Sequence, residues 1–98
     1  MQTTLEKDGG KLTIAVSGRV DTTTAPELEK AVFENTDGIK ELVLDLKEMS
    51  YISSAGLRVL LKSEKKMKAQ GEMTLINVNN DVMEILDMTG FSDILTIG

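Results

Sequence analysis

The chain has 98 residues, of which 41% are hydrophobic and 28% are charged, so it is a single globular domain and not a disordered or low-complexity chain. It contains neither cysteine nor histidine, which excludes disulfides, thiolate zinc sites, thiol nucleophiles and Ser-His-Asp triads. Its net charge of −5 disfavours binding to nucleic acid or anionic membranes, and its longest apolar runs are too short for membrane insertion.

The N-terminal segment has the alternating pattern of a β-hairpin. Residues 2–7 and 11–17 are predicted strands, and in the second of them Leu12, Ile14 and Val16 alternate with smaller or polar side chains. Asp8-Gly9-Gly10 lies between them and suits a tight turn, because glycine accepts a positive φ.

A first helix is predicted from Thr24 to about Glu34. Thr24 is a good N-cap, Pro26 fits the first turn, and Glu27 completes a capping box with Thr24. The apolar stripe of this helix consists of Leu28, Ala31 and Val32. Residues 40–46 follow, with the nearly continuous apolar run of a strand that is buried on both faces, and we expect them to form the central strand.

The remaining segments continue the alternation of helices and strands. In chain order we expect a loop over residues 47–52, a long helix over 54–69, a strand over 72–78, a third helix over 81–89 and a last short strand over 91–97. Gly71 is expected to end the second helix, and Gly90 the third, each in left-handed conformation. This order predicts one α/β domain over residues 1–98, with a mixed, mainly parallel sheet of four or five strands, an N-terminal hairpin and three helices.

Two serines lie where the longest helix begins, at the carboxyl end of the central strand, where function gathers in open α/β sheets. The free N–H groups and the dipole of a helix N-terminus favour an anion there. From the residues alone, Ser53 and Ser54 have three interpretations: a helix cap, a phosphorylation site, or a cradle for the phosphate of a ligand. The third lacks the lysine and the first glycine of a P-loop.

Two aspartates are further candidates. Asp21, in Gly18-Arg19-Val20-Asp21, suits a turn in which its side chain bonds its own backbone. Asp45 lies on the predicted buried strand and needs a partner or an exposed strand end. The pair could together hold Mg²⁺, but two carboxylates distant in sequence are a weak metal signal, and we expect neither metal nor cofactor. No paired-carboxylate spacing suggests catalysis, so we do not expect an enzyme.

The whole chain resembles the STAS domain, and in particular the bacterial anti-sigma factor antagonists. Three segments carry the resemblance: Gly18-Arg19-Val20-Asp21, the strand Leu42-Val43-Leu44-Asp45-Leu46, and Tyr51-Ile52-Ser53-Ser54-Ala55-Gly56-Leu57. The third is similar to the family motif at the strand-to-helix turn, except that Ser53 stands where many members have aspartate. The family often ends with a further C-terminal helix, which we expect to be reduced or absent here.

The resemblance implies a phosphorylation-gated interaction module. Ser54 matches the serine that a partner kinase phosphorylates, with Ser53 as the second choice, and Asp21 matches an acidic residue near that serine in the fold. The residues expected to bind the partner are Asp21, Ser53, Ser54, Ala55, Gly56 and Arg58. Gly56 has no side chain, so a partner or phosphate is expected to approach its backbone closely.

The implied partners are an anti-sigma factor with serine kinase activity, bound by the unmodified protein, and a phosphatase for the phosphorylated form. Neither nucleic acid nor direct membrane insertion is expected. Residues 1–6 lack the features of a secretory signal, and with the absence of cysteine this favours a cytoplasmic location. Two alternatives stay open: a STAS subunit of a membrane transport system, and a STAS module that binds a nucleotide.

Overall fold

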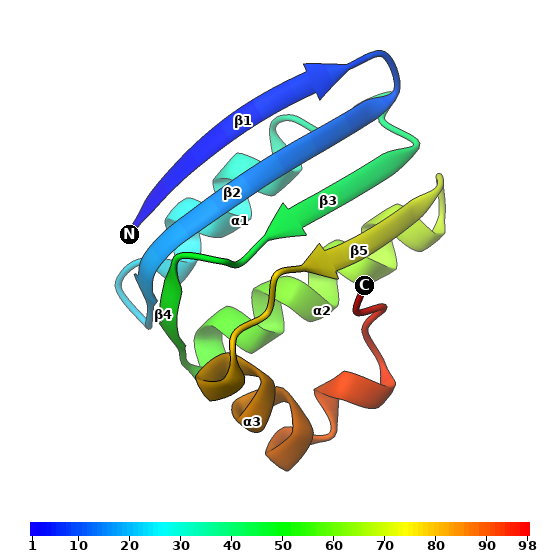
Figure 1. Ribbon diagram of the computed structural model, residues 1–98. Helices are drawn as coiled ribbons and strands as arrows, with labels where there is room; N and C mark the ends of the chain where they lie inside the picture. Colours follow the sequence, from blue (N-terminus) through cyan, green and yellow to red (C-terminus); the bar gives the residue numbers. More distant parts are fainter.

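Five strands, three helices and one 3₁₀ turn follow one another in the computed structural model, which describes residues 1–98 (Figure 1). The strands are β1 (Gln2–Asp8), β2 (Lys11–Val20), β3 (Glu41–Asp45), β4 (Met49–Ile52) and β5 (Glu72–Ile76). The helices are α1 (Ala25–Phe33), α2 (Ser54–Lys68) and α3 (Asn80–Thr89), and the 3₁₀ turn η1 covers Phe91–Asp93.

The sheet has the strand order β1-β2-β3-β5, and β4 pairs with the far end of β2. The β1–β2 pair is antiparallel and every other pair is parallel. The predicted α/β fold with a mixed sheet, an N-terminal hairpin and three helices is therefore confirmed. Gly9 has the positive φ expected of the hairpin turn, at 62°.

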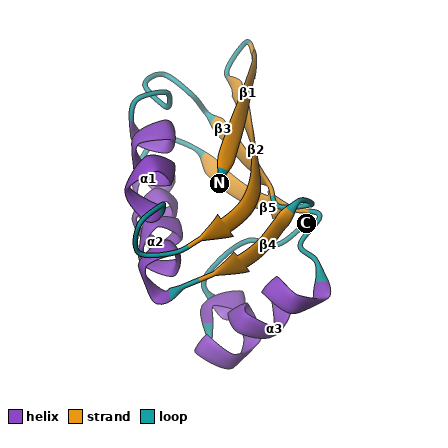
Figure 2. Cartoon of the chain, turned by 90° about the vertical axis from the view of Figure 1, so that its left-hand side faces the viewer, coloured by secondary structure: helices purple, strands orange, loops and turns teal.

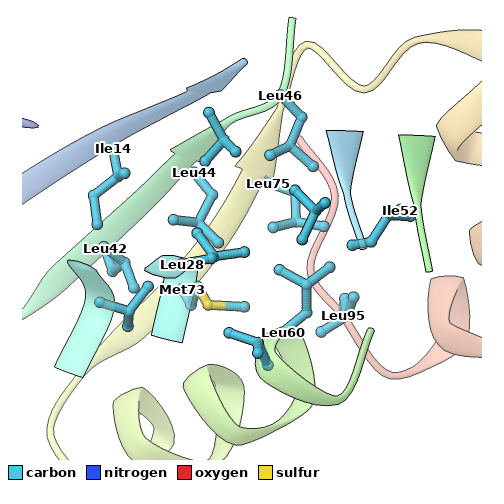
Figure 3. Close-up of a cluster of buried hydrophobic side chains, with 14 of the residues drawn as sticks. Ile14, Leu28, Leu42, Leu44, Leu46, Ile52, Leu60, Met73, Leu75 and Leu95 are labelled. Atoms are coloured by element: carbon cyan, nitrogen blue, oxygen red, sulfur yellow. The ribbon is translucent and has the colours of Figure 1, made fainter. Parts of the chain in front are cut away.

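The register of the sheet explains how the core is built. Leu12 of β2 pairs with Leu42 of β3, which pairs with Met73 of β5. The next row toward the carboxyl ends of the strands is made in the same way from Ile14, Leu44 and Leu75. Because side chains alternate between the faces of a sheet, both rows point to one side, where they meet buried side chains such as Leu28 and Leu60 (Figure 3).

Helices α1 and α2 lie side by side and cover this face of the sheet, whereas α3 lies apart from them, next to β4 (Figure 2). Leu28 and Val32 form the buried stripe of α1, and Leu57, Leu60 and Met67 lie on the buried side of α2. The stripe of α1 is the predicted one, except that Ala31 is half-buried. An exposed ion pair between Glu29 and Lys62, at 3.1 Å, joins the two helices at the surface.

The expectation of a loop over residues 47–52 was wrong, because Met49–Ile52 form the strand β4. The strand β2 is longer than predicted and continues to Val20, beyond the end of β3. Its free length pairs with β4, as Val20 does with Ile52. Four residues with only Met49 and Ile52 buried carry too little pattern to predict a strand, and the partner strand supplies the missing stabilisation.

The predicted last strand over residues 91–97 was also wrong. Phe91–Asp93 form η1, and only Ile97 makes a bridge to Leu75 at the edge of β5. Strand β5 itself ends at Ile76, two residues before the predicted end. Asn77 follows with a φ of 55°, the one residue other than glycine with a positive φ, and this left-handed backbone leaves the strand direction.

Gly90 ends α3 in left-handed conformation, with a φ of 79°, as predicted. The prediction for Gly71 was wrong, because this glycine has no positive φ. A Cβ atom on residue 71 would instead overlap the backbone carbonyl of Lys40, where the chain enters β3. Glycine is required there by the close approach of two backbones rather than by helix capping.

Candidate functional site

The motifs noted in the sequence meet where β2 ends and α2 begins. After a bulge between Gly18 and Arg19, β2 pairs with β4, so that Arg19 lies beside Tyr51 and Val20 beside Ile52. The backbone N–H of Ser53 then donates a hydrogen bond of 2.8 Å to the carbonyl of Val20. Asp21 and Ser53, far apart in the sequence, are thereby brought to the same edge of the sheet.

The two serines have different environments. Ser53 is half-buried and is the N-cap of α2: its hydroxyl accepts a hydrogen bond from the backbone N–H of Gly56 at 3.4 Å. Ser54 is the first residue of the helix, is exposed, and its hydroxyl makes no hydrogen bond within the chain. The capping interpretation therefore applies to Ser53, while Ser54 presents a free hydroxyl where the helix dipole favours negative charge.

Asp21 organises the turn between β2 and α1. One of its carboxylate oxygens accepts hydrogen bonds from the backbone N–H groups of Thr23 and Thr24, at 3.0 and 3.1 Å. The hydroxyl of Thr24 lies 3.2 Å from the same oxygen, donates to the carbonyl of Arg19, and accepts from the N–H of Asp21. The predicted capping box of Thr24 and Glu27 was wrong: the Thr24 side chain caps no helical N–H, and the backbone N–H of Thr24, which Glu27 would accept in a capping box, bonds Asp21 instead.

These hydrogen bonds hold the pKa of Asp21 below its ordinary value. The backbone N–H of Thr24 has the largest effect, the hydrogen bond from Thr23 adds to it, and the positive charge of Arg19 acts in the same direction. Arg19 itself lies over the ring of Tyr51, 4.5 Å from its centroid, which is cation–π geometry. The site thus contains an ionised carboxylate and a guanidinium stacked on Tyr51, both at the end of β2.

Replacing Asp21 by asparagine is expected to lower stability at pH 7, and to lower it less as the pH falls below about 4. A carboxylate with a lowered folded-state pKa stabilises the fold above its unfolded pKa of about 3.9 and loses this effect as the pH falls through the folded value. Urea unfolding between pH 7 and pH 3 measures the difference in the free energy of unfolding between wild type and Asp21→Asn. An equal difference at both ends of this range would contradict a role for the charge.

The other predicted site residues divide between the surface and the core. Arg58 is exposed and lies one turn after Ser54; with Ala55 it lines a shallow groove between α2 and the start of α1. Gly56 is buried and faces inward, where a Cβ atom would lie 2.6 Å from Ile52 Cγ1 and 2.8 Å from Val20 Cγ1. The structure thus gives a different reason for this glycine: it lets α2 start close to the ends of β2 and β4.

Gly56→Ala is expected to destabilise the fold, because both neighbours of the new methyl group are buried, branched side chains. Overpacking typically costs about 1–3 kcal/mol, which lowers the Tm by roughly 4–8 °C for each kcal/mol in a domain of this size. Thermal unfolding measures the effect. Val20→Ala in the same chain should restore part of the loss, whereas additive losses from the two changes would contradict this packing explanation.

The two aspartates considered together as a Mg²⁺ pair, Asp21 and Asp45, have separate roles. Asp45 accepts hydrogen bonds from the backbone N–H of Lys47 and from the side-chain amide of Asn77, both at 3.1 Å. Asn77 thereby links the end of β3 to the loop after β5. Nowhere in residues 1–98 do three or more acidic side chains gather as a metal site would require. None of the helices combines the length and the hydropathy needed to cross a membrane.

Comparison with known proteins shows the family of this chain. The family model of the STAS domain matches residues 2–98. The chain belongs to the STAS domain family. Its curated relatives include the anti-sigma-B factor antagonist of Listeria monocytogenes, which is 35% identical over 95 residues that cover 94% of this chain and 82% of the relative.

Solved structures of anti-sigma factor antagonists share the fold. The crystal structure of an anti-sigma factor antagonist from Mycobacterium paratuberculosis matches with a TM-score of 0.88 and 26% identity, over 98% of this chain and 83% of that one. SpoIIAA, a Bacillus anti-sigma factor antagonist, matches in its unphosphorylated form with a TM-score of 0.72 and 16% identity, over 99% of this chain and 87% of that one. The phosphorylated form of SpoIIAA matches with a TM-score of 0.76 and 14% identity, over 99% of this chain and 91% of that one. At this identity the SpoIIAA likeness concerns the fold alone.

Sequence reasoning missed the stacked pair of Arg19 and Tyr51 and the role of Thr24 in holding Asp21. The stacked pair depends on β4, which brings Tyr51 beside Arg19. The chain has one tyrosine, and it lies three residues before Ser54. An aromatic residue at that distance from the site was the available signal, but its partner could be found only once the strands were paired.

Proposed function

We propose that this STAS domain is an anti-sigma factor antagonist whose binding is controlled by phosphorylation. When Ser54 is unmodified, the chain binds an anti-sigma factor that is also a serine kinase; when Ser54 is phosphorylated, it is released. The observation that carries the proposal is the free, exposed hydroxyl of Ser54 on the first residue of α2. The family membership and the antagonist relatives support it.

Ser54 is preferred over Ser53 as the phosphate acceptor because a kinase needs an accessible hydroxyl. The hydroxyl of Ser53 is half-buried and bonds the N–H of Gly56, so its phosphorylation would cost the cap of α2. Ser54 has no such bond to lose. A phosphate on it would lie at the positive end of the helix dipole, where it stabilises the helix.

Phosphorylation is expected to change the surface of this site and not the fold. The modification adds about −1.5 to −2 charges. Burying that charge in an interface is costly unless the partner supplies a cation, and the ionised Asp21 on the neighbouring strand end adds to the negative potential. Within the chain, Arg58 stands one turn along the helix, at the spacing that lets a guanidinium approach the phosphate.

The surface proposed to bind the kinase consists of Asp21, Ser53, Ser54, Ala55 and Arg58, with Gly56 beneath them. The chain is the substrate and ligand in this scheme and not an enzyme, so ATP and Mg²⁺ belong to the kinase. A phosphatase returns the phosphorylated form to the binding state. These partners act in the cytoplasm, where we place this protein as well.

Capture from a lysate of the source organism tests the proposal. Wild type, Ser54→Asp and Ser54→Ala serve as baits, the last as a control that removes the hydroxyl without adding a charge. We expect wild type and Ser54→Ala to retain a small ATP-dependent serine kinase, and Ser54→Asp to retain much less of it. Equal recovery of transporter subunits by all three baits would replace this proposal with the membrane-transport role.

A further inference from the structure

The net negative charge of this protein is confined to its C-terminal third. Residues 1–68 contain eleven acidic and eleven basic side chains, whereas residues 69–98 contain five acidic side chains and no basic one. The whole net charge of −5 therefore arises after α2. Four of the five acidic residues lie in α3 and η1: Asp81, Glu84, Asp87 and Asp93.

The outer face of α3 combines this charge with exposed apolar side chains. Asp87 and Met88 follow Glu84 by three and four residues, so the three share one side of the helix, where all of them are exposed. Met88 is 80% exposed, the most exposed large hydrophobic residue of the chain, and Ile94, just after η1, is 49% exposed. The turn η1 packs against α3, so these residues form one region, which we call the α3 surface.

Nothing in the chain neutralises or covers the α3 surface. Both ion pairs of the protein lie elsewhere, on α1 and α2 and the loop after α1. In Figure 2, α3 is separate from the layer of α1 and α2, so its outer face is open. The buried face of the same helix, with Val82 and Leu86 fully buried, anchors it to the core.

We propose that the α3 surface is a second docking surface, which binds a basic amphipathic helix of a partner protein. Lysine or arginine side chains of such a helix complement Glu84 and Asp87, and its apolar side chains meet Met88 and Ile94. The flexible thioether of methionine suits apolar partners of different shape. Anionic membranes and nucleic acids carry the same charge as this surface, which leaves a basic protein segment as the occupant.

This inference does not rest on phosphorylation, because the α3 surface contains none of the residues proposed to bind the kinase at the start of α2. Its test therefore needs no kinase. The probe is a synthetic 14-residue helix of lysine and leucine with all leucines on one face, compared with a scrambled peptide of the same composition. Binding is followed by fluorescence anisotropy and by amide chemical shifts of the labelled protein.

The decisive variants change one property at a time. Met88→Ser with Ile94→Ser removes the apolar part and keeps the charge; Glu84→Lys with Asp87→Lys reverses the charge. The β1–β2 hairpin offers matched controls in Leu5→Ser, since Leu5 is 39% exposed, and in Glu6→Lys with Asp8→Lys. Thermal unfolding checks that each variant is folded.

We expect the amphipathic peptide to bind with a Kd on the order of 10 µM at low salt, about −7 kcal/mol. Each α3 variant should weaken binding at least about fivefold and each hairpin variant less than about twofold, with chemical shifts confined to residues 80–95, and salt should weaken it further. The proposal is overturned if the peptide does not bind, if the scrambled peptide binds equally well, or if removal of Met88 and Ile94 leaves the affinity unchanged.

Discussion

Ser54→Ala is expected to bind the kinase partner as tightly as wild type and to accept no phosphate from it. Removing one hydroxyl from an exposed first helical residue deletes no hydrogen bond of the chain, so neither the fold nor the interface should suffer. Wild type phosphorylated on Ser54 should bind at least about 100-fold more weakly, because close to two negative charges must be desolvated. Calorimetric titration with the purified kinase measures the affinities of Ser54→Ala and of the phosphorylated wild type.

Ser54→Asp should fall between these limits, since one carboxylate carries about half the charge of the phosphate. Ser53→Ala is the matched control: it removes the cap of α2, which costs about 1 kcal/mol of stability, but it should still be phosphorylated. Mass spectrometry that finds phosphate in Ser54→Ala, on Ser53, would show that the neighbouring serine is the acceptor. Unchanged affinity of the phosphorylated protein would refute the proposed control itself.

Gly71→Ala is expected to destabilise the fold more than any other glycine-to-alanine change in this chain. The added Cβ would overlap the backbone carbonyl of Lys40, which also accepts the N–H of Glu72 at 2.9 Å. The N–H of Lys40 is bonded in turn to the carbonyl of Gly10 at 2.8 Å, so the obstructing backbone is held on both sides. We expect a loss of about 3 kcal/mol, and a Tm lower by more than roughly 12 °C.

Gly10→Ala provides the matched control, because it adds a methyl group against the same Lys40. There the nearest atom is Lys40 Cγ at 3.8 Å, an ordinary van der Waals contact, and the change should stay within about 0.5 kcal/mol. Chemical denaturation of both variants gives the comparison. Similar stability of Gly71→Ala and Gly10→Ala would mean that the turn after α2 and the start of β3 can separate at little cost.

The elements that could be predicted from sequence are those whose pattern repeats over many residues. The alternation in β2 and the helical stripes of α1 and α2 each bury several side chains of one face, so the period alone identifies them, and the continuous apolar run identifies β3. The serine pair could be placed for the same reason, because it lies between a recognisable strand and a recognisable helix. The resemblance to the STAS family then named the residues to examine.

What could not be predicted depends on partners distant in the chain. The four residues of β4 become a strand only because β2 extends past β3 and offers it a free edge. The same pairing sets Arg19 over Tyr51 and brings Asp21 to the start of α2. Local patterns record which face of an element is apolar, whereas the position of a single polar side chain is fixed by contacts between elements, and those exist only in the folded chain.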